Sequence, residues 1–239
     1  MKIIDAPQGS PEWFAARVAR VTASRIADVM AKGRSGAPSA SRAGYMGELI
    51  AETLTGQPCN PFDGNADTQR GNELEPDARA LYEVAKGAMV DSVGLVIHPR
   101  IERAGASPDG IVSTEGLLEI KAPRTHVHLE YLLAGQPPAK YLPQMAWQAA
   151  CCEAEWVDFV SYCPTMPEDL RLFVVRYVPP AAYLRELEAA VVEFLAEMDD
   201  KLRQIQQIRQ PLSEIVAASI DRGRMPEVEY LGWQPRALA

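Results

Sequence analysis

The sequence contains no long hydrophobic run. No window approaches the roughly 18 uninterrupted apolar residues of a membrane span. The first residues, Met1-Lys2-Ile3-Ile4-Asp5, include no apolar core of a signal peptide. We therefore expect a cytoplasmic protein without a membrane partner.

Cysteine and positive charge are also scarce. The four cysteines form no C-x-x-C pair and no zinc-finger spacing with histidine, so we expect free thiols, packed as small hydrophobic residues, in a reducing compartment. A net charge of -8 excludes a protein coated in basic residues. The cysteines are Cys59, Cys151, Cys152 and Cys163.

The charge is distributed unevenly along the chain. Residues 1–43 hold seven Lys or Arg against three Asp or Glu, whereas residues 153–200 hold three against eleven. A basic face on an acidic body can guide DNA to one surface, although such a gradient also arises by chance. The gradient permits a nucleic-acid partner without requiring one.

With 239 residues, no internal repeat and no linker-like stretch, the chain is expected to form a single domain over 1–239. The patterns predict a mostly helical part over 10–88, a sheet core over 89–178 and an acidic helix over 181–208 followed by a tail. The fold class is therefore mixed α/β.

Helical signals dominate the first part. Ser10 as N-cap and Pro11 as first helical residue predict a short helix through Arg17. The spacing of apolar residues then predicts further helices, and Gly, Ser and Pro clusters predict surface loops between them. The helices are expected from near Thr22, over Tyr45–Leu54 and over Glu73–Val84, with loops at Gly33–Ser39 and Pro58–Asn65.

Short runs rich in Val and Ile dominate the second part and indicate strands. The first four lie close together along the chain, which predicts a strand meander. A buried helix over Tyr141–Cys152 should precede the last two strands. The expected strands are Met89–Ile97, Arg103–Ser107, Gly110–Val112, Leu117–Ile120, Trp156–Tyr162 and Leu172–Val178.

Two segments carry residues suited to catalysis: Ser107-Pro108-Asp109-Gly110 and Leu117-Leu118-Glu119-Ile120-Lys121. Taken alone, the first is typical of a tight turn, in which Pro presets φ and Gly tolerates positive φ. The second alone fits a strand with two outward charges, because residues two apart share a face. Both ordinary explanations remain open for each segment by itself.

Together the segments form P-D-x(9)-E-x-K. A hairpin would bring Asp109 beside Glu119, and paired carboxylates suit Mg²⁺, which prefers oxygen ligands. The backbone carbonyl of Ile120 offers another oxygen. Lys121, on the face of Glu119, would orient an attacking water or stabilise charge on a phosphorus centre. The pattern therefore favours metal-dependent phosphodiester hydrolysis.

Three ordered blocks resemble the lambda-exonuclease-type, YqaJ-like viral recombinase family of the PD-(D/E)XK nuclease superfamily. Trp13-Phe-Ala-Ala-Arg17 with Val21-Thr22-Ala23-Ser24 is similar to the family's W-x-x-x-R and [IV]-T-A-S signature. Gly71 to Arg79 is similar to its G-x-x-x-E-x-x-A-R helix, and Ser107 to Pro123 to its catalytic block. The resemblance spans roughly residues 10–150 and implies a central mixed β-sheet flanked by helices.

The resemblance also implies residue roles. Asp109, Glu119 and the Ile120 carbonyl would bind one or two Mg²⁺ ions, which Mn²⁺ can replace, and Glu75 would lie beside them, through water. Lys121 would serve the nucleophilic water. The 5′-phosphate and DNA contacts would be Arg17, Ser24 and Ser107, with Gln144 and Arg124. Without the resemblance, each residue has an ordinary explanation. Glu75 would be a solvated helix charge that pairs with Arg79. Arg17 would be a surface charge, and Ser24 would be a helix cap.

Two positions depart from the family pattern. The family often shows Q-x-Q in the helix after Tyr141, whereas this chain has Gln144-Met145-Ala146, so a polar contact is expected to be missing. The family's basic residue after the lysine is replaced by Val127; Arg124, His126 and His128 are possible substitutes. The two histidines would share a face at two-residue spacing, as residues of a loop or surface rather than a zinc site.

The resemblance implies a phage or prophage exonuclease that digests one strand of duplex DNA from the 5′ end and leaves 3′ single-stranded tails for recombination. It also implies a homotrimeric ring that encircles DNA and a single-strand annealing protein as partner. Two alternatives remain: a structure-specific or restriction-like endonuclease with the same core, and a DNA-end binding module without catalysis. The presence of all four of Glu75, Asp109, Glu119 and Lys121 opposes the last alternative.

Overall fold

The computed structural model describes residues 1–33, 36–59 and 66–220, without the side chains of 66–68 and 209–220. The two predicted loops, Gly33–Ser39 and Pro58–Asn65, lie partly outside the described residues. The chain divides into two compact units, residues 1–195 and 196–239. The single domain over 1–239 stays a prediction. Within the described part of the chain, no helix is long and apolar enough to cross a membrane.

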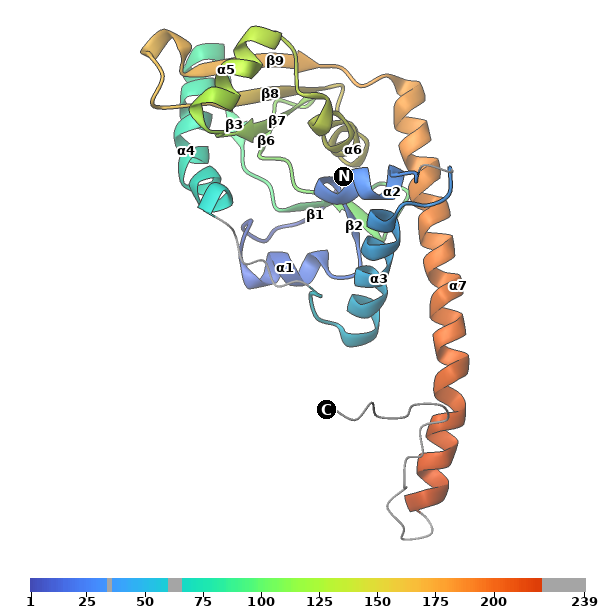
Figure 1. Cartoon of the computed structure of the whole chain (residues 1–239). Coiled ribbons are helices and arrows are strands. Elements are labelled where there is room, and N and C mark those ends of the chain that lie inside the picture. The colour runs from blue at the N-terminus through green and yellow to red at the C-terminus, as the bar shows by residue number, and fades with distance from the viewer. Residues whose placement is uncertain (34–35, 60–65, 221–239) are drawn as a thin grey trace, which may run out of the picture. The chain divides into compact units, whose positions relative to one another are not determined.

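Two sheets and several helices make up the first unit (Figure 1). The strands are β1 (Lys2–Ile4), β2 (Val21–Thr22), β3 (Val90–Asp91), β4 (Leu95–Ile97), β5 (Ala104–Ala106), β6 (Gly110–Val112), β7 (Gly116–Lys121), β8 (Trp156–Tyr162) and β9 (Leu172–Tyr177). The α-helices are α1 (Pro11–Arg17), α2 (Ile26–Met30), α3 (Ala40–Thr55), α4 (Ala66–Lys86), α5 (Thr125–Ala134), α6 (Leu142–Cys152) and α7 (Ala181–Ile220), with 3₁₀ turns η1 (Ala23–Arg25), η2 (Ala139–Tyr141) and η3 (Glu168–Leu170).

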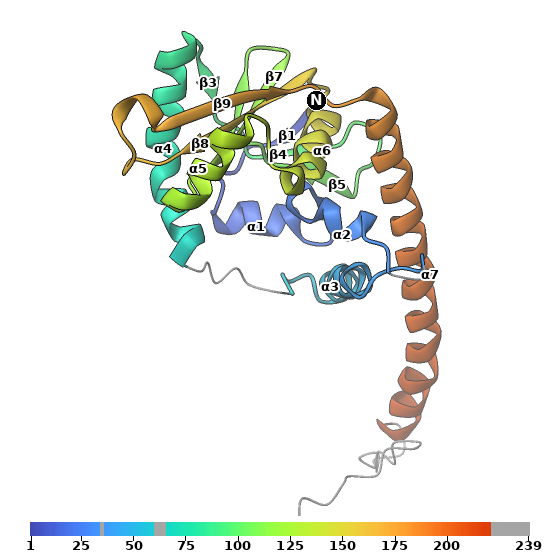
Figure 2. The same ribbon diagram turned by 45° about the horizontal axis from the view of Figure 1, so that its top comes forward.

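The larger sheet has the order β3-β6-β7-β8-β9 and is mixed, because β7 and β8 run parallel while the other neighbours are antiparallel. Helix α4 covers one face, and α5 and α6 cover the other (Figures 1 and 2). This arrangement confirms the predicted mixed sheet flanked by helices.

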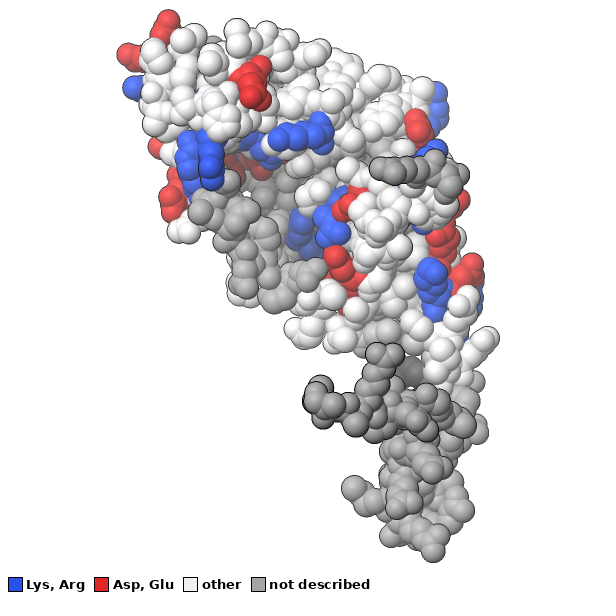
Figure 3. Space-filling view, viewed as in Figure 1, with Lys and Arg blue, Asp and Glu red and all other residues white. Residues whose placement is uncertain are grey.

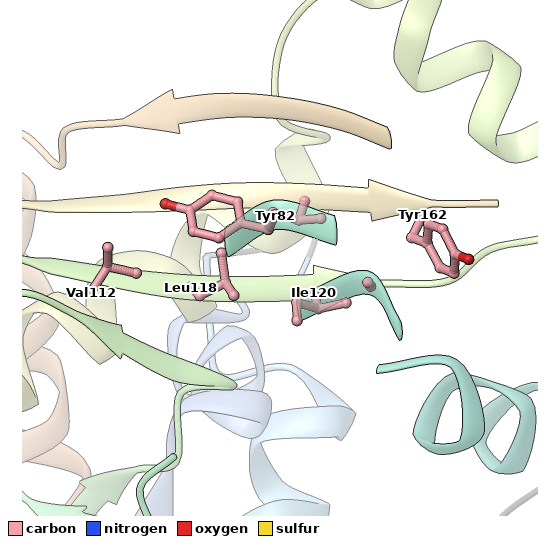
Figure 4. Close-up of a cluster of buried hydrophobic side chains, with 7 residues drawn as sticks. Tyr82, Val112, Leu118, Ile120 and Tyr162 are labelled. Atoms are coloured by element: carbon pink, nitrogen blue, oxygen red, sulfur yellow. The ribbon is translucent and has the colours of Figure 1, made fainter. Parts of the chain in front are cut away.

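Alternation along β7 determines which side chains enter which layer. Leu118 and Ile120 pack with Tyr82 of α4, as Figure 4 shows. Leu117 points to the opposite face and packs with Met145 and Ala149 of α6. Because strand side chains alternate with a period of two, Glu119 and Lys121 belong to the face of Leu117. The catalytic candidates therefore lie on the face covered by α6.

The predicted meander is confirmed for the antiparallel pairs β4–β5 and β6–β7, but it is wrong as a single sheet. β4 and β5 belong to a separate sheet of order β1-β4-β5-β2, and only β3, β6 and β7 join the larger sheet. Besides β5, β4 pairs with β1, where Lys2 lies opposite Ile97 although most of the first hundred residues separate them. Short apolar runs show where strands form, but the choice of partner depends on contacts distant in sequence.

Other boundaries also differ from the prediction. Thr22 ends β2, and the helix expected near Thr22 begins as the 3₁₀ turn η1 at Ala23 and continues as α2 from Ile26. α4 continues through Pro76, and α7 extends to Ile220, beyond the predicted end at 208. Helix α5 was not predicted. The short first helix is confirmed, since the Ser10 hydroxyl accepts from the Trp13 amide at 3.2 Å.

Candidate active site

The β6–β7 hairpin brings Asp109 beside Glu119, as the spacing predicts. Gly110 pairs with Leu118 in antiparallel register, and the Asp109 amide donates to the Leu118 carbonyl at 3.1 Å. The Ile120 amide donates to Asp109 Oδ2 at 2.6 Å. The aspartate is therefore fixed by the hairpin at the backbone and at its carboxylate.

Gly110 is required by a close approach rather than by a turn. A Cβ atom at this position would lie 2.2 Å from Val90 Cγ1 of the neighbouring strand β3. Gly110 belongs to β6, and its φ is not in the left-handed region. The tight-turn explanation of Ser-Pro-Asp-Gly is therefore wrong for this glycine.

Glu119 is fully buried, and two amides hold its carboxylate. Gln144 Nε2 donates to Oε1 at 2.7 Å, and Gln148 Nε2 donates to Oε2 at 2.6 Å. Both glutamines lie on α6, where residues four apart share a face. The expected loss of a polar contact at Ala146 is therefore wrong, because Gln148 supplies it one helical turn after Gln144. The i,i+4 spacing of the two glutamines was the sequence signal.

Lys121 contacts Glu119 Oε1 directly. Burial alone would lower the pKa of Lys121, but the carboxylates of Glu119 and Asp109 outweigh burial and raise the pKa. The side chain therefore remains an ammonium group. In this form it can donate hydrogen bonds and stabilise negative charge.

Two carboxyl groups beside Glu119 have raised pKa values. For Asp109 the main cause is burial, followed by repulsion from Glu119, and its pKa lies well above the ordinary value. For Glu75 the main cause is again burial, countered by Arg79 and Lys121. A bound cation would relieve this repulsion.

Arg79 connects Glu75 to the hairpin. One guanidinium nitrogen donates to Glu75 Oε1 at 2.6 Å and to the Asp109 carbonyl at 2.7 Å, and another donates to Ser92 Oγ at 2.6 Å. The ordinary explanation of Glu75, a pair with Arg79, is thus present in the structure. The pair also brings Glu75 to the catalytic hairpin.

The oxygen donors of this site suit a hard divalent cation, although they do not enclose one as they stand. Among the described residues, no three or more His, Cys, Asp or Glu side chains are grouped as a metal cage. Glu119 instead contacts an ammonium and two amides. Oxygen-only ligands and carboxyl groups that repel one another are nevertheless the chemistry that Mg²⁺ matches.

Arg17, Ser24 and Ser107, far apart in sequence, meet at one cavity of about 840 Å³, which Glu75 and Arg79 also line. Arg17 donates to Ser24 Oγ at 3.4 Å, and its guanidinium lies 4.1 Å from the centre of the Trp13 ring. The Trp13 indole donates to Ser107 Oγ at 2.9 Å. Trp13 therefore joins the three predicted residues into one pocket, here called the end pocket.

Arg17 differs from another cation of the end pocket. Arg25 pairs with Asp28 at 2.6 Å and with Glu48 at 2.7 Å. No ion pair is found for Arg17 in the described part of the chain, and burial lowers its pKa, countered by Tyr45 and Glu52. Arg17 is thus a partly buried positive charge available to an anion.

The remaining candidates lie elsewhere. Arg124 is exposed at the N-cap of α5, and His126 is exposed in its first turn. His128 is buried and contacts Ser161 Oγ at 2.7 Å and the Leu170 carbonyl at 2.8 Å. The predicted common face of the two histidines is wrong, because residues two apart on a helix diverge. His128 is a core residue.

The cysteines are all free, as expected, but not all are buried. Cys59 is exposed and Cys152 is partly exposed, whereas Cys151 and Cys163 are buried. The expectation of small buried residues is therefore wrong for Cys59.

Gln8 is a site residue that the sequence did not reveal. Its Nε2 donates to the Val93 carbonyl at 3.0 Å and to the Pro108 carbonyl at 2.9 Å. Arg79 holds the next carbonyl along the chain, that of Asp109. Gln8 and Arg79 therefore hold the consecutive backbone carbonyls of Pro108 and Asp109. A lone glutamine before a helix gave no signal of this contact.

Comparison with known proteins identifies the fold first. The structure resembles the alkaline exonuclease LHK-Exo of Laribacter hongkongensis, with 45% identity, 85% of this chain and 100% of that chain covered, and a TM-score of 0.78. The same enzyme in complex with dAMP gives the same values. A phage-related exonuclease from Haemophilus somnus 129PT, at 16% identity, a TM-score of 0.59 and coverage of 80% and 96%, shares the fold. The fold is that of the PD-(D/E)XK class.

The family follows from the sequence match. The YqaJ-like viral recombinase domain matches residues 12–155, which is more than half of the chain. No curated protein matches. The chain belongs to the YqaJ-like, lambda-exonuclease-type viral recombinase family.

Proposed function

We propose that the protein is a Mg²⁺-dependent exonuclease that digests one strand of linear duplex DNA from the 5′ end, with Mn²⁺ as a substitute metal. The observation that carries the proposal is the union of two features in one site. A hairpin presents Asp109, Glu119 and Lys121, and a pocket with the unpaired cation Arg17 adjoins it through Glu75 and Arg79. Family membership and the likeness to an alkaline exonuclease support a nuclease.

The metal ligands in this proposal are Asp109, Glu119 and the Ile120 carbonyl, with Glu75 acting through water. One or two bound ions would polarise the scissile phosphate and supply a nucleophilic hydroxide. Gln144 and Gln148 hold the Glu119 carboxylate in place. Lys121, as an ammonium, stabilises the negative charge that grows on the phosphate oxygens during attack.

The end pocket determines where the enzyme starts. In this proposal Arg17 grips the 5′-phosphate, and the hydroxyls of Ser24 and Ser107 donate to its oxygens. Stacking on Trp13 holds the guanidinium in place. Because the end pocket adjoins the hairpin, the terminal nucleotide would span the two, and the next phosphate would be cut. Arg124 and Gln144 are additional proposed DNA contacts.

The wider biology is proposed from the family alone. The product would carry 3′ single-stranded tails for recombination by an annealing protein, in a phage or prophage setting. Three copies would form a ring around the duplex. Mass photometry tests this assembly: a monomer at all protein concentrations, with and without DNA, opposes the ring.

One assay tests activity, polarity and the end pocket together. Linear duplexes labelled separately at each end, with 5′-phosphate or 5′-hydroxyl, are incubated with protein and Mg²⁺. The expected result is loss of the 5′-end label first, and faster loss from phosphorylated ends. Cutting of closed circles at comparable rates would indicate the endonuclease alternative. Binding of ends without any cleavage would indicate the non-catalytic alternative.

A further inference from the structure

The ring of Tyr141 lies close to two lysines. Lys121 Nζ is 5.3 Å from the ring centre, and Lys140 Nζ is 4.8 Å from it. The ring also stacks on Phe159 of β8, with 5.7 Å between centres and 25° between planes. Tyr141 is therefore anchored in the sheet, and it holds a second ammonium group beside the catalytic one.

Lys140 is exposed and carries an uncompensated charge. In the described part of the chain it forms no ion pair with a carboxylate, unlike Lys121, which contacts Glu119. A cation held over an aromatic face keeps its charge while losing some freedom of movement. Such a side chain suits an anion that arrives from solvent.

Lys140 lies outside the end pocket. Arg17, Ser24 and Ser107 line the large cavity, whereas neither Tyr141 nor Lys140 lines it. Lys121 is the link, because it contacts Glu119 in the hairpin and faces the Tyr141 ring. Figure 3 shows several Lys and Arg side chains on one face of the molecule.

We propose that Lys140 binds the phosphate immediately 3′ of the scissile phosphate on the strand being digested. The inference rests on the proposed function and deepens it. Three successive phosphates would then meet Arg17, Lys121 and Lys140 in that order. The third contact holds the strand when the first nucleotide has been released and the end pocket is empty. Tyr141 acts as a positioning residue for both lysines.

The test asks whether Lys140 contacts the phosphate immediately 3′ of the scissile phosphate. Binding of 5′-phosphorylated duplexes is measured by fluorescence anisotropy with Ca²⁺ in place of Mg²⁺. One duplex carries a neutral methylphosphonate between nucleotides 2 and 3, and a control duplex carries it deep in the duplex. Wild-type protein should bind the first about fivefold more weakly than unmodified DNA, the upper range for a solvent-exposed charge contact. Lys140→Gln should show almost no such difference.

Salt dependence provides a second readout. Loss of one phosphate contact should reduce the slope of log affinity against log salt by about 0.7 to 0.9 in Lys140→Gln. Lys2→Gln is the matched control, because Lys2 is also exposed and its removal changes net charge equally. Tyr141→Phe, which keeps the ring beside Lys140, should retain most of the methylphosphonate effect, whereas Tyr141→Leu should weaken it.

Two results would overturn the inference: equal methylphosphonate sensitivity in Lys140→Gln and wild type, or equal slopes in Lys140→Gln and Lys2→Gln. Failure of the proposed nuclease function would give a different result from failure of the Lys140 inference. Wild-type protein that cuts no linear duplex in Mg²⁺ contradicts the nuclease proposal, whereas the anisotropy measurements still decide on Lys140, because they require no cleavage.

Discussion

The catalytic hairpin and the end pocket hold their charges in opposite ways. In the hairpin, Glu119 has no exposed surface and receives donors from Gln144, Gln148 and Lys121. In the end pocket, Arg17 has contacts to Trp13 and Ser24 but no carboxylate partner among the described residues. Glu119 therefore has its hydrogen-bond donors within the protein, whereas the positive charge of Arg17 has no carboxylate partner in the described part of the chain.

Because they hold their charges differently, the catalytic hairpin and the end pocket are suited to different tasks. A centre that performs chemistry benefits from groups held before the substrate arrives, because no reorganisation is then required during reaction. A pocket that selects a phosphate end benefits from a cation whose partner is the ligand itself. Substitutions in the hairpin should therefore act on turnover, and substitutions in the end pocket on the choice of substrate.

Lys121→Ala gives the largest expected effect and the most direct test of the hairpin's role. Turnover on linear duplex should fall by at least about 10²-fold, the scale of a positioned electrostatic group, with DNA binding largely retained. Single-turnover cleavage and anisotropy measure the two separately. Lys86→Ala, an exposed lysine at the end of α4, is the control and should cut normally. Unchanged turnover in Lys121→Ala removes this residue from the mechanism.

Gln148→Leu tests whether amides prepare Glu119 for its role. Loss of a hydrogen bond to a buried carboxylate costs about 1.5–3 kcal/mol, which corresponds to roughly a tenfold to hundredfold weaker metal affinity. Calorimetric titration with Mn²⁺ measures that affinity without reference to cleavage. Gln148→Asn, with its shorter amide, should recover part of the loss. Wild-type metal affinity in Gln148→Leu would show that Gln144 and Lys121 suffice.

Arg17→Gln should reduce the preference for 5′-phosphate ends rather than the turnover. The ratio of kcat/KM for 5′-phosphate over 5′-hydroxyl ends should fall by about tenfold or more, the scale of one charge-assisted contact. Turnover on hydroxyl ends should change little. Arg185→Gln, an exposed arginine on α7, controls for net charge. A variant that loses turnover on both ends equally would place Arg17 in the chemistry and erase the distinction between the two regions.

The raised pKa of Asp109 predicts a smaller, pH-dependent effect on stability. Between the ordinary pKa in the unfolded chain and the raised pKa in the folded protein, the folded state retains a proton that the unfolded state has lost. The free energy of unfolding therefore falls as pH rises through this window. Without metal, Asp109→Asn should melt about 3 °C higher than wild type above the window.

Thermal melts in EDTA across pH values measure this difference. Below the ordinary pKa of aspartate, both proteins carry a neutral side chain, so their Tm values should coincide. A rise in Tm that is the same at every pH would indicate improved packing rather than relief of a buried charge.

The hairpin was predictable because its information is local. Asp109 directly precedes β6 and Glu119 lies in the adjacent strand β7, and a period of two places Glu119 and Lys121 on one face. The end pocket was accessible only through family resemblance, since Arg17 and Ser107 are far apart in sequence. No spacing rule connects them through the indole of Trp13.

Contacts between distant side chains and backbone escaped prediction. Gln8 reaches the Pro108 carbonyl across 100 positions, and nothing in its neighbourhood marks it. The split of the strands into two sheets was missed for the same reason, because β1 pairs with β4 rather than with a sequence neighbour. Gln148 is an exception. Its i,i+4 spacing from Gln144 is visible in the sequence, but the Q-x-Q pattern of the family places the second glutamine at position 146, which is Ala146 here.

The pairing of β1 with β4 also constrains the order in which the protein can form during synthesis. Lys2 and Gln8 find their partners only when residues near Ile97 and Pro108 have been made. At a ribosomal rate of about 5–20 residues per second, the first strand waits on the order of 5 to 20 s. Throughout that interval the backbone edge of β1 stays open to other partners, and Gln8 lacks the Pro108 carbonyl to which it donates in the folded protein.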